Sequence, residues 1–355
     1  MPELYEGINC RCRSNGLTLA VELARRHILA RIIDKRDSSS TLSRALGITS
    51  RSLELLSPLG VSRQLIEEGI AIQEARIYQG TRLVMRMPLH SCSSYFPTIL
   101  GLPKDRIEMV PSATLSAMGV QVEYQLELLQ FNKEGNQVVA ELSNGENETF
   151  DYIVGAGGIH SAVRECANIA YPGFDLKEKW SIADVENWPY SKTFTLTQMK
   201  PGLVAVSVPI RENRFRFVSS CENALEAFPL PLKIHKVRSE GVFKVSVRQA
   251  ESYSKGRIHL VGDAAHCCIP VGGRGMNLGI ADAVELAKRM AGNPLDGYSE
   301  FRQREDKKVI AITERGRKIV TAKTLVARME FNTVLVAAKY SPFVKRRLSR
   351  FVVEC

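Results

Sequence analysis

One segment constrains the fold of this chain more than any other: residues 257–290, which read RIHLVGDAAHCCIPVGGRGMNLGIADAVELAKRM. An apolar run at 257–262 predicts a buried strand that ends at Gly262 and Asp263. A glycine-rich loop follows, and an amphipathic helix is expected from near Met276 to Met290. This order of strand, loop and helix predicts an α/β fold with a parallel sheet buried on both faces.

Other segments repeat the alternation of strand and helix. Residues 16–30 have helical periodicity, and ARIID at 30–34 follows as a short strand, which is the second half of a βαβ unit. Residues 150–156 form a second apolar strand, followed by a helix at 161–167. We therefore expect a dinucleotide-binding layer built from three pieces, near 16–44, 150–166 and 257–292.

The length of 355 residues exceeds what one hydrophobic core normally supports, so two packed domains are expected. Residues 180–217 have strand-like patterning without helical periodicity, which indicates an inserted sheet-rich substrate domain. The predicted division is a dinucleotide-binding domain at 1–70, 101–175 and 251–295, the sheet-rich domain at 71–100 and 176–250, and C-terminal helices at 296–355.

The loop before the predicted helix has the chemistry of a ligand cradle. Gly272, Gly273 and Gly275 leave no side chains between the backbone and a flat ring. The N–H groups of Met276 and Asn277, at the positive end of the helix dipole, would stabilise negative charge on a ligand. At the strand end, the carboxylate of Asp263 would accept hydrogen bonds from ribityl or ribose hydroxyls.

This segment resembles the third FAD motif of the class A flavoprotein monooxygenases, the aromatic-ring hydroxylases of the p-hydroxybenzoate hydroxylase fold. The residues that match are Gly262, Asp263, Ala264, Ala265, His266, Pro270, Gly272, Gly273, Gly275, Met276, Asn277, Gly279, Asp282 and Ala283. The resemblance implies a Rossmann-like FAD-binding domain, with the loop of Pro270, Gly272, Gly273 and Gly275 beside the flavin. His266 by itself is interpreted as a structural hydrogen-bonding residue.

Two other segments extend the resemblance. Arg44, in SRALGITSRSLELL, matches an arginine that reaches the FAD, although a surface salt bridge is the alternative. Asp34 matches the acid that binds the adenosine ribose, and it follows Gly16 at nearly the usual spacing of about 20 residues. In DYIVGAGGIHSAVRE, Gly155 and Gly158 match glycines of the second FAD motif.

The chain also departs from the family's pattern. Arg11 and Arg13 stand at the first two glycine positions of G-x-G-x-x-G, and only Gly16 remains. The arginines either pair with phosphate or belong to an aberrant start of the chain, residues 1–13, which we favour. Gly157 replaces a characteristic aspartate, and Pro111 is expected to interrupt a helix.

The resemblance implies that NADH or NADPH reduces the FAD, and that one oxygen atom of O2 is then inserted into an aromatic or related organic substrate. The flavin would perform this chemistry, so neither a metal nor a protein nucleophile is expected. Two alternatives remain open. One is a flavin reductase or dehydrogenase, and the other is a degenerate paralogue that keeps the fold and binds a partner without competent FAD.

The net charge of +10 is concentrated near the C-terminus, where residues 302–350 contain 14 Lys or Arg and 4 Asp or Glu. This basic region is interpreted as a solvated helix face, with contact to an anionic membrane surface as the alternative. No nucleic-acid-binding motif accompanies it. The eight cysteines lack metal-ligand spacing, and there is neither a secretory signal nor a long apolar run, so a cytoplasmic protein with reduced thiols is expected.

Overall fold

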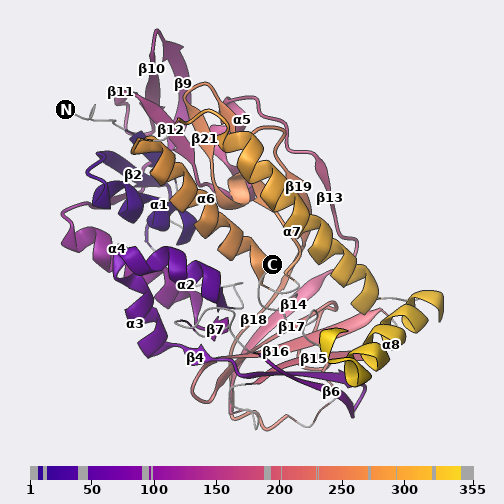
Figure 1. Ribbon diagram of the computed structural model, residues 1–355. Helices are drawn as coiled ribbons and strands as arrows, with labels where there is room; N and C mark the ends of the chain where they lie inside the picture. Colours follow the sequence, from indigo (N-terminus) through magenta and orange to yellow (C-terminus); the bar gives the residue numbers. More distant parts are fainter. Residues whose placement is uncertain are drawn as a thin grey trace.

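The fold contains two large sheets with helices packed between and around them (Figure 1). The computed structural model describes residues 7–10, 14–38, 47–89, 96, 99–187, 193–200, 202–228, 230, 232–270, 273–292, 294–321 and 325–344.

The first sheet has six strands in the order β20-β21-β12-β1-β2-β8, and all neighbours are parallel except β20 and β21. Its strands are β1 (Gly7–Cys10), β2 (Ala30–Asp34), β8 (Val122–Tyr124), β12 (Tyr152–Gly155), β20 (Ser254–Lys255) and β21 (Ile258–Leu260). The predicted strands at 30–34, 150–156 and 257–262 are thus confirmed as parallel strands of one sheet. The α/β class is confirmed as well.

Strand β1 lies in the middle of this sheet, between β12 and β2. Residues 7–10 thus pair on both sides, and the interpretation of residues 1–13 as an aberrant start stays a prediction. Helix α1 (Ser14–Arg25) connects β1 to the parallel strand β2, which completes the βαβ unit. From β1 the chain passes through α1 to β2, on one side of β1, whereas β12 pairs with the other side. The strand order therefore reverses at β1, and the carboxyl end of β1 is a topological switch point.

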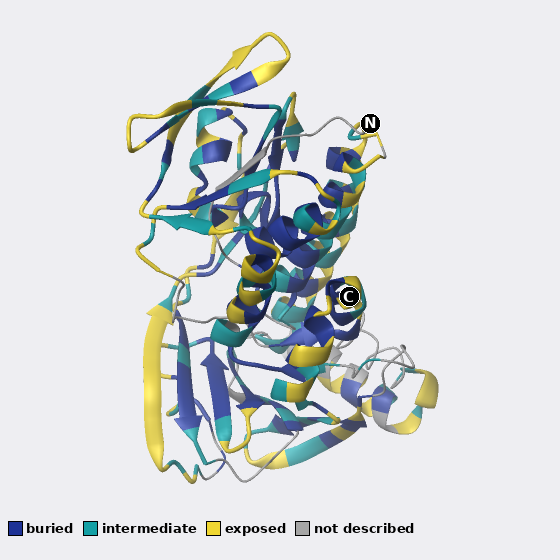
Figure 2. Ribbon diagram, turned by 90° about the vertical axis from the view of Figure 1, so that its left-hand side faces the viewer, coloured by how far each residue is buried: buried dark blue, intermediate teal, exposed yellow. Residues whose placement is uncertain are grey.

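The second sheet has seven strands in the order β18-β14-β17-β16-β15-β5-β6. They are β5 (Glu74–Gln79), β6 (Arg82–Pro88), β14 (Trp180–Glu186), β15 (Thr193–Lys200), β16 (Leu203–Arg211), β17 (Arg214–Ser219) and β18 (Lys236–Phe243). Figure 2 shows β18 as an exposed edge beside buried inner strands. The division into domains by residue range stays a prediction.

Three small sheets complete the strands, in the orders β11-β10-β9, β13-β19-β22 and β3-β7-β4. Their bounds are β3 (Ile48–Thr49), β4 (Ile70–Ala71), β7 (Ile99–Gly101), β9 (Leu128–Glu134), β10 (Gln137–Leu142), β11 (Asn147–Phe150), β13 (Gly173–Asp175), β19 (Ser246–Gln249) and β22 (His266–Cys267). The short helices and turns are α2 (Ser50–Leu56), η1 (Ser57–Leu59), α3 (Val61–Glu68), η2 (Gly158–His160), α5 (Ala162–Cys166) and η3 (Gly262–Ala264).

Helix α4 (Lys104–Ala117) runs through Pro111, so the prediction that this proline interrupts the helix was wrong. A proline in a helix interior removes one backbone hydrogen bond and costs about 3 kcal/mol. Ile107, Val110 and Leu115 of α4 are almost fully buried in the core that α4 shares with α1 and α2. The burial of this apolar face offsets the cost of the proline.

Three longer helices follow the first sheet: α6 (Arg274–Met290), α7 (Tyr298–Val320) and α8 (Leu325–Tyr340). Helix α7 connects the two halves of the molecule (Figure 1). Tyr298, at its start, is buried in the core of the six-stranded sheet, whereas Ile319 and Val320 pack against the core of the seven-stranded sheet. Within the described part of the chain, every helix is too short or too polar to cross a lipid bilayer.

Candidate functional site

A cavity of about 940 Å³ opens at the carboxyl edge of the six-stranded sheet. It is bounded by the start of α1, the turn after β12, the loop between β21 and α6, and the connection from β18 to β19. Among the residues predicted to contact a cofactor, the lining includes Gly158, Asp263, Pro270, Gly273, Gly275 and Met276. Segments separated by more than two hundred positions in the sequence therefore meet at one site.

Helix α6 presents its N-terminus to the cavity. Gly273 is the N-cap residue and has φ +66, a left-handed conformation that favours glycine, so the helix begins at Arg274 rather than near Met276. A Cβ atom added to Gly275 would lie 3.5 Å from Cys268 Sγ and 3.8 Å from Asp263 Oδ1, and both are ordinary contact distances. Gly275 thus leaves space beside the first-turn N–H groups, which have no partner within the helix.

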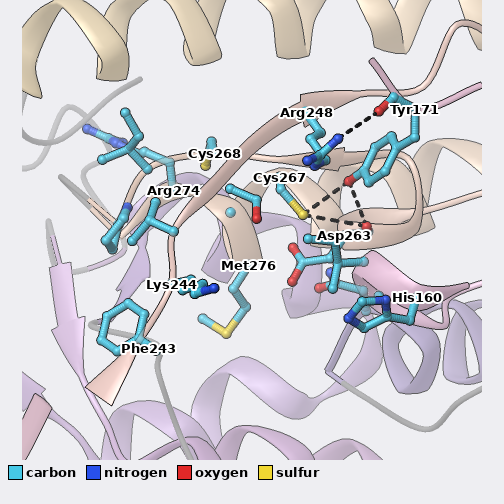
Figure 3. A pocket seen from close by; sticks show the side chains of 18 of the residues that line it. His160, Tyr171, Phe243, Lys244, Arg248, Asp263, Cys267, Cys268, Arg274 and Met276 are labelled. Atoms are coloured by element: carbon cyan, nitrogen blue, oxygen red, sulfur yellow. Dashed lines mark hydrogen bonds between the residues drawn. The ribbon is translucent and has the colours of Figure 1, made fainter. Parts of the chain in front are cut away.

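Asp263 lies in the turn η3, directly after β21, and lines the cavity together with Met276 and Lys244 (Figure 3). Its backbone is held in place because the Tyr171 hydroxyl donates to the Asp263 carbonyl oxygen at 2.9 Å. The Tyr171 hydroxyl also lies 3.0 Å from Cys267 Sγ. A fixed backbone at the strand end leaves the carboxylate available to accept hydrogen bonds from a ligand.

Two of the predicted cofactor glycines serve close packing. Gly262 has φ +60, and a Cβ there would lie 2.2 Å from Asn15 Nδ2. A Cβ on Gly155 would lie 2.9 Å from side-chain carbons of both Leu260 and Val163. Neither glycine is among the residues that line the cavity. These two positions are therefore explained by the close approach of neighbouring elements.

Asn277 and Asp34 use their side chains within the protein. Asn277 Nδ2 donates to the carbonyl oxygen of Gly273 at 2.8 Å, and its Oδ1 accepts from the Thr49 N–H at 3.0 Å. Asn277 therefore fastens α6 to β3. Asp34, at the end of β2, is buried and accepts from the Arg36 guanidinium at 2.6 Å.

The remaining predicted residues divide into two groups. Gly16 lies in the first turn of α1 and is buried beside the cavity-lining Ser14 and Asn15. Arg44 and Gly272, together with Arg11 and Arg13, lie outside the described residues.

A buried ionic cluster lies behind the loop from β21 to α6. Asp282 of α6 accepts hydrogen bonds from the Gly262 N–H at 2.9 Å, from His266 Nε2 at 2.6 Å and from Arg302 Nε at 2.7 Å. Arg302 also donates to Asp306 at 2.7 Å, and Asp306 Oδ2 lies 3.3 Å from His266 Nε2. The cluster thus connects the loop, α6 and α7. The sequence analysis interpreted His266 by itself as a structural residue and did not predict this cluster.

The charges within this cluster depend on one another. Burial opposes protonation of His266, but the Asp306 and Asp282 carboxylates outweigh it and raise the pKa of His266 to about 9. Burial also opposes ionisation of Asp282, yet His266 and Arg302 lower the pKa of Asp282. For Asp306, burial and the nearby Asp282 charge raise the pKa. At neutral pH, His266 is therefore a cation paired with an ionised Asp282.

Basic side chains from several elements line the cavity. His160, Arg164, Lys244, Arg248 and Arg274 are all lining residues, and several of them are labelled in Figure 3. Arg164 donates to backbone carbonyl oxygens in η2 and η3, at 2.8 and 3.3 Å, so it also holds these two turns together. The lining also contains Glu165, Asp175 and Asp263, and two of these acids pair with Arg164 and Arg248, so the basic side chains are largely balanced.

Two adjacent thiols complete the lining. Cys267 and Cys268 are both free cysteines. Burial raises the pKa of Cys268 to about 12, and burial and then the nearby Asp263 charge raise the pKa of Cys267. Both thiols are therefore neutral at physiological pH and are weak nucleophiles.

The donor set of the cavity fits FAD. Two helix N-termini, those of α1 and α6, face one space, and such termini bind a pyrophosphate or the electron-rich edge of a reduced ring. The Asp263 carboxylate is an acceptor suited to sugar hydroxyls, and the missing Cβ of Gly275 leaves room for a flat ring. The volume lies within the range of small-molecule binding sites, about 300–1,000 Å³.

Comparisons with known proteins agree with this geometry. A family model described as "FAD binding domain" matches residues 14–227 and 221–299. The chain is 27% identical over 308 residues to rifampicin monooxygenase of Streptomyces venezuelae, covering 80% of this chain and 63% of that protein. It is 30% identical over 305 residues to pentachlorophenol 4-monooxygenase of Sphingobium chlorophenolicum, covering 78% and 56%. The chain thus spans less than two thirds of the length of these relatives.

A solved structure has the same fold. The crystal structure of p-nitrophenol 4-monooxygenase from Pseudomonas putida superimposes with a TM-score of 0.88 at 18% identity, covering all of both chains. The resemblance of the sequence to class A flavoprotein monooxygenases is thereby confirmed at the level of family and fold.

Proposed function

This chain belongs to the FAD binding domain family, and from that premise we propose that it is an NAD(P)H-dependent flavin monooxygenase. It would insert one oxygen atom from O2 into an aromatic or related organic substrate. The family membership supports FAD as the cofactor, and the names of the relatives, which include rifampicin and pentachlorophenol monooxygenases, support the reaction class.

One observation carries the proposal: the N-termini of α1 and α6 and the Asp263 carboxylate line a single cavity. In an extended FAD, the pyrophosphate, the ribityl chain and the ring require different partners in this order. An α-helix N-terminus suits phosphate, a carboxylate suits hydroxyls, and a second helix N-terminus suits the ring edge that becomes negative on reduction.

When bound, the flavin supplies the electron transfer and the activation of O2. The chain supplies binding and orientation. Asp263 would hold the hydroxyl-bearing part of the cofactor, and the first-turn backbone N–H groups of α6, including that of Met276, would face the ring. Gly273 and Gly275 would let the ring approach these groups closely. Neutral Cys267 and Cys268 would line the site without reacting with the substrate.

A second surface supports a peripheral contact with an anionic membrane. Met329, Val336, Tyr340 and Phe343 are exposed at 67%, 56%, 75% and 73%, and their spacing places them on one face of α8 and the turn that follows. The sequence KRRLSR at 345–350 adds positive charge directly after them. Exposed apolar side chains next to basic residues are typical of proteins that bind a lipid surface.

The visible absorption spectrum of the purified chain tests the proposal, because bound flavin absorbs visible light. NADH and NADPH oxidation is then measured with a panel of phenols that includes pentachlorophenol and p-nitrophenol, and products are analysed after reaction with isotopically labelled O2. One labelled oxygen atom in the product supports a monooxygenase. Substrate-independent oxidation of NAD(P)H without labelled product favours a reductase, and a colourless protein that does not take up FAD overturns the proposal.

A further inference from the structure

One face of helix α7 is polar and yet buried. Tyr298, Arg302 and Asp306 follow one another at intervals of four residues, so they lie on the same side of the helix. Their exposed fractions are 0%, 6% and 0%. Charged residues are almost never fully buried unless they are paired, so this face of α7 must have specific partners.

The partners include the end of the strand that leads to the cofactor turn. The Tyr298 hydroxyl donates to the carbonyl oxygen of Leu260, the last residue of β21, at 3.0 Å. Arg302 Nε donates to Asp282 Oδ1 at 2.7 Å, and the other oxygen of that carboxylate accepts from the Gly262 N–H at 2.9 Å. A single carboxylate therefore separates Arg302 from the backbone of the turn η3.

A second carboxylate fixes the orientation of the Arg302 guanidinium. Arg302 Nη2 donates to Asp306 at 2.7 Å and to the carbonyl oxygen of Leu278, in α6, at 3.5 Å. The planar guanidinium presents its donors in a rigid fork, so a partner on one side determines where the donors on the other side lie. Arg302 can therefore determine which oxygen of Asp282 faces the turn.

The same helix also reaches the other half of the molecule. Ile310, Ile319 and Val320 of α7 pack against the core of the seven-stranded sheet, and Figure 1 shows the helix running between the two halves. Arg302 thus connects the cofactor turn to a helix whose far end packs on the sheet-rich half.

We propose that Arg302 is a positioning residue for the cofactor, although it is not among the residues that line the cavity. It orients the Asp282 carboxylate, and this carboxylate holds the Gly262 N–H. The carboxylate of the next residue, Asp263, is thereby presented to the hydroxyls of the cofactor. The inference rests on the proposed flavoprotein function.

Loss of Arg302 would disturb the charge balance behind the turn. Asp282 and Asp306 would then be two buried acids beside one cation, His266, and like charges at close range disfavour the ionisation of both acids. A protonated or rotated Asp282 would hold the turn less well. The Asp263 carboxylate would then meet the cofactor at a poorer distance and angle.

Titration of the FAD-free full chain with FAD tests this role. We expect Arg302→Met, which nearly keeps the side-chain length and removes the donors, to raise the FAD dissociation constant about tenfold, the effect of one hydrogen bond to a charged group. Arg302→Lys keeps the positive charge and should recover part of the affinity. Arg304→Met, at an exposed position of the same helix, is the matched control and should bind FAD like the wild type.

A double-mutant cycle separates positioning from a general loss of stability. If Arg302 acts through Asp263, Arg302→Met should have little further effect on the FAD dissociation constant in the Asp263→Ala background. A merely structural role would give the same loss in both backgrounds. If Arg302→Met does not fold, as judged by the melting temperature of the FAD-free protein, the same cycle is measured with Asp306→Asn. This variant keeps the volume of the site, and we expect about a threefold loss that also depends on Asp263.

Two results would overturn the inference. One is an unchanged FAD dissociation constant in the Arg302 variant, and the other is an equal loss of affinity with and without the Asp263 carboxylate. Failure of the wild-type chain to bind FAD at all would instead refute the flavoprotein function itself.

Discussion

His266 Nε2 and Asp282 Oδ2 lie 2.6 Å apart in a site with no access to solvent, between the ligand-binding loop and helix α6. The same carboxylate oxygen accepts from the Gly262 N–H, at the turn where β21 ends. The backbone that presents Asp263 to the cavity is therefore positioned by an ion pair behind it.

Removal of the Asp282 carboxylate should destabilise the whole protein. Asp282→Ala leaves His266, Arg302 and the Gly262 N–H without their shared acceptor, and breaking a buried ion pair in this way costs about 3–5 kcal/mol. The free energy of unfolding, measured with urea, checks this value. Glu285→Ala, three residues further along α6 and only partly buried, is the control and should change the free energy far less.

Stability should fall at alkaline pH through His266. Its pKa is raised from 6.5 to about 9, so its stabilising contribution is fully present below pH about 6.5 and is lost as the pH rises through about 9. The free energy of unfolding, measured with urea at several pH values, should therefore decline between pH about 6.5 and 9. The decline should be smaller in the variant His266→Gln. Parallel curves for the two proteins would disprove this role of His266.

Loss of the Asp263 carboxylate should weaken FAD binding without unfolding the protein. Asp263→Ala removes the proposed acceptor of cofactor hydroxyls, and we expect a loss of about 1–3 kcal/mol in binding free energy. Titration of the FAD-free protein with FAD measures this change, with the exposed Asp296→Ala as the control. If the dissociation constant does not change, Asp263 lies outside the binding site.

Filling the space beside Gly275 should exclude the flavin ring. The side chain of Gly275→Val would project toward Cys268 and Asp263 and occupy the proposed ring position. We expect a protein that folds but lacks the visible flavin spectrum. The control is Ala281→Val, which lies on the same helix α6. Gly119→Val would not serve, because Gly119 has φ +81 and a valine there would be strained. A normal flavin spectrum in Gly275→Val would move the ring away from this loop.

The proposed membrane contact predicts a salt-dependent association with anionic vesicles. The chain should sediment with phosphatidylserine vesicles at low salt and be released at high salt, because the attraction of basic residues is screened. Tyr340→Ser combined with Phe343→Ser removes two exposed apolar side chains and should reduce binding even at low salt. Equal sedimentation with neutral vesicles would argue against an electrostatic contact.

The sequence by itself determined the elements whose signals are local. The apolar run before Gly262, the glycines at 272–275 and the helical periodicity up to Met290 specify a strand, a loop and a helix within about thirty residues. Family resemblance in the same segment was enough to predict FAD. The fold class followed because strands alternating with helices can bury their apolar faces in few other ways.

Only the tertiary structure decided what individual side chains do. Gly262 and Gly275 look alike in the sequence, yet the first is packed against Asn15 of a distant helix and the second borders the cavity. Likewise, the pKa of His266 is raised by the carboxylate of Asp306, which belongs to α7. These contacts join segments that are far apart along the chain, and local periodicity carries no information on which segments meet. Packing of the helices on the sheet fixed these contacts, and they in turn determined the geometry of the site.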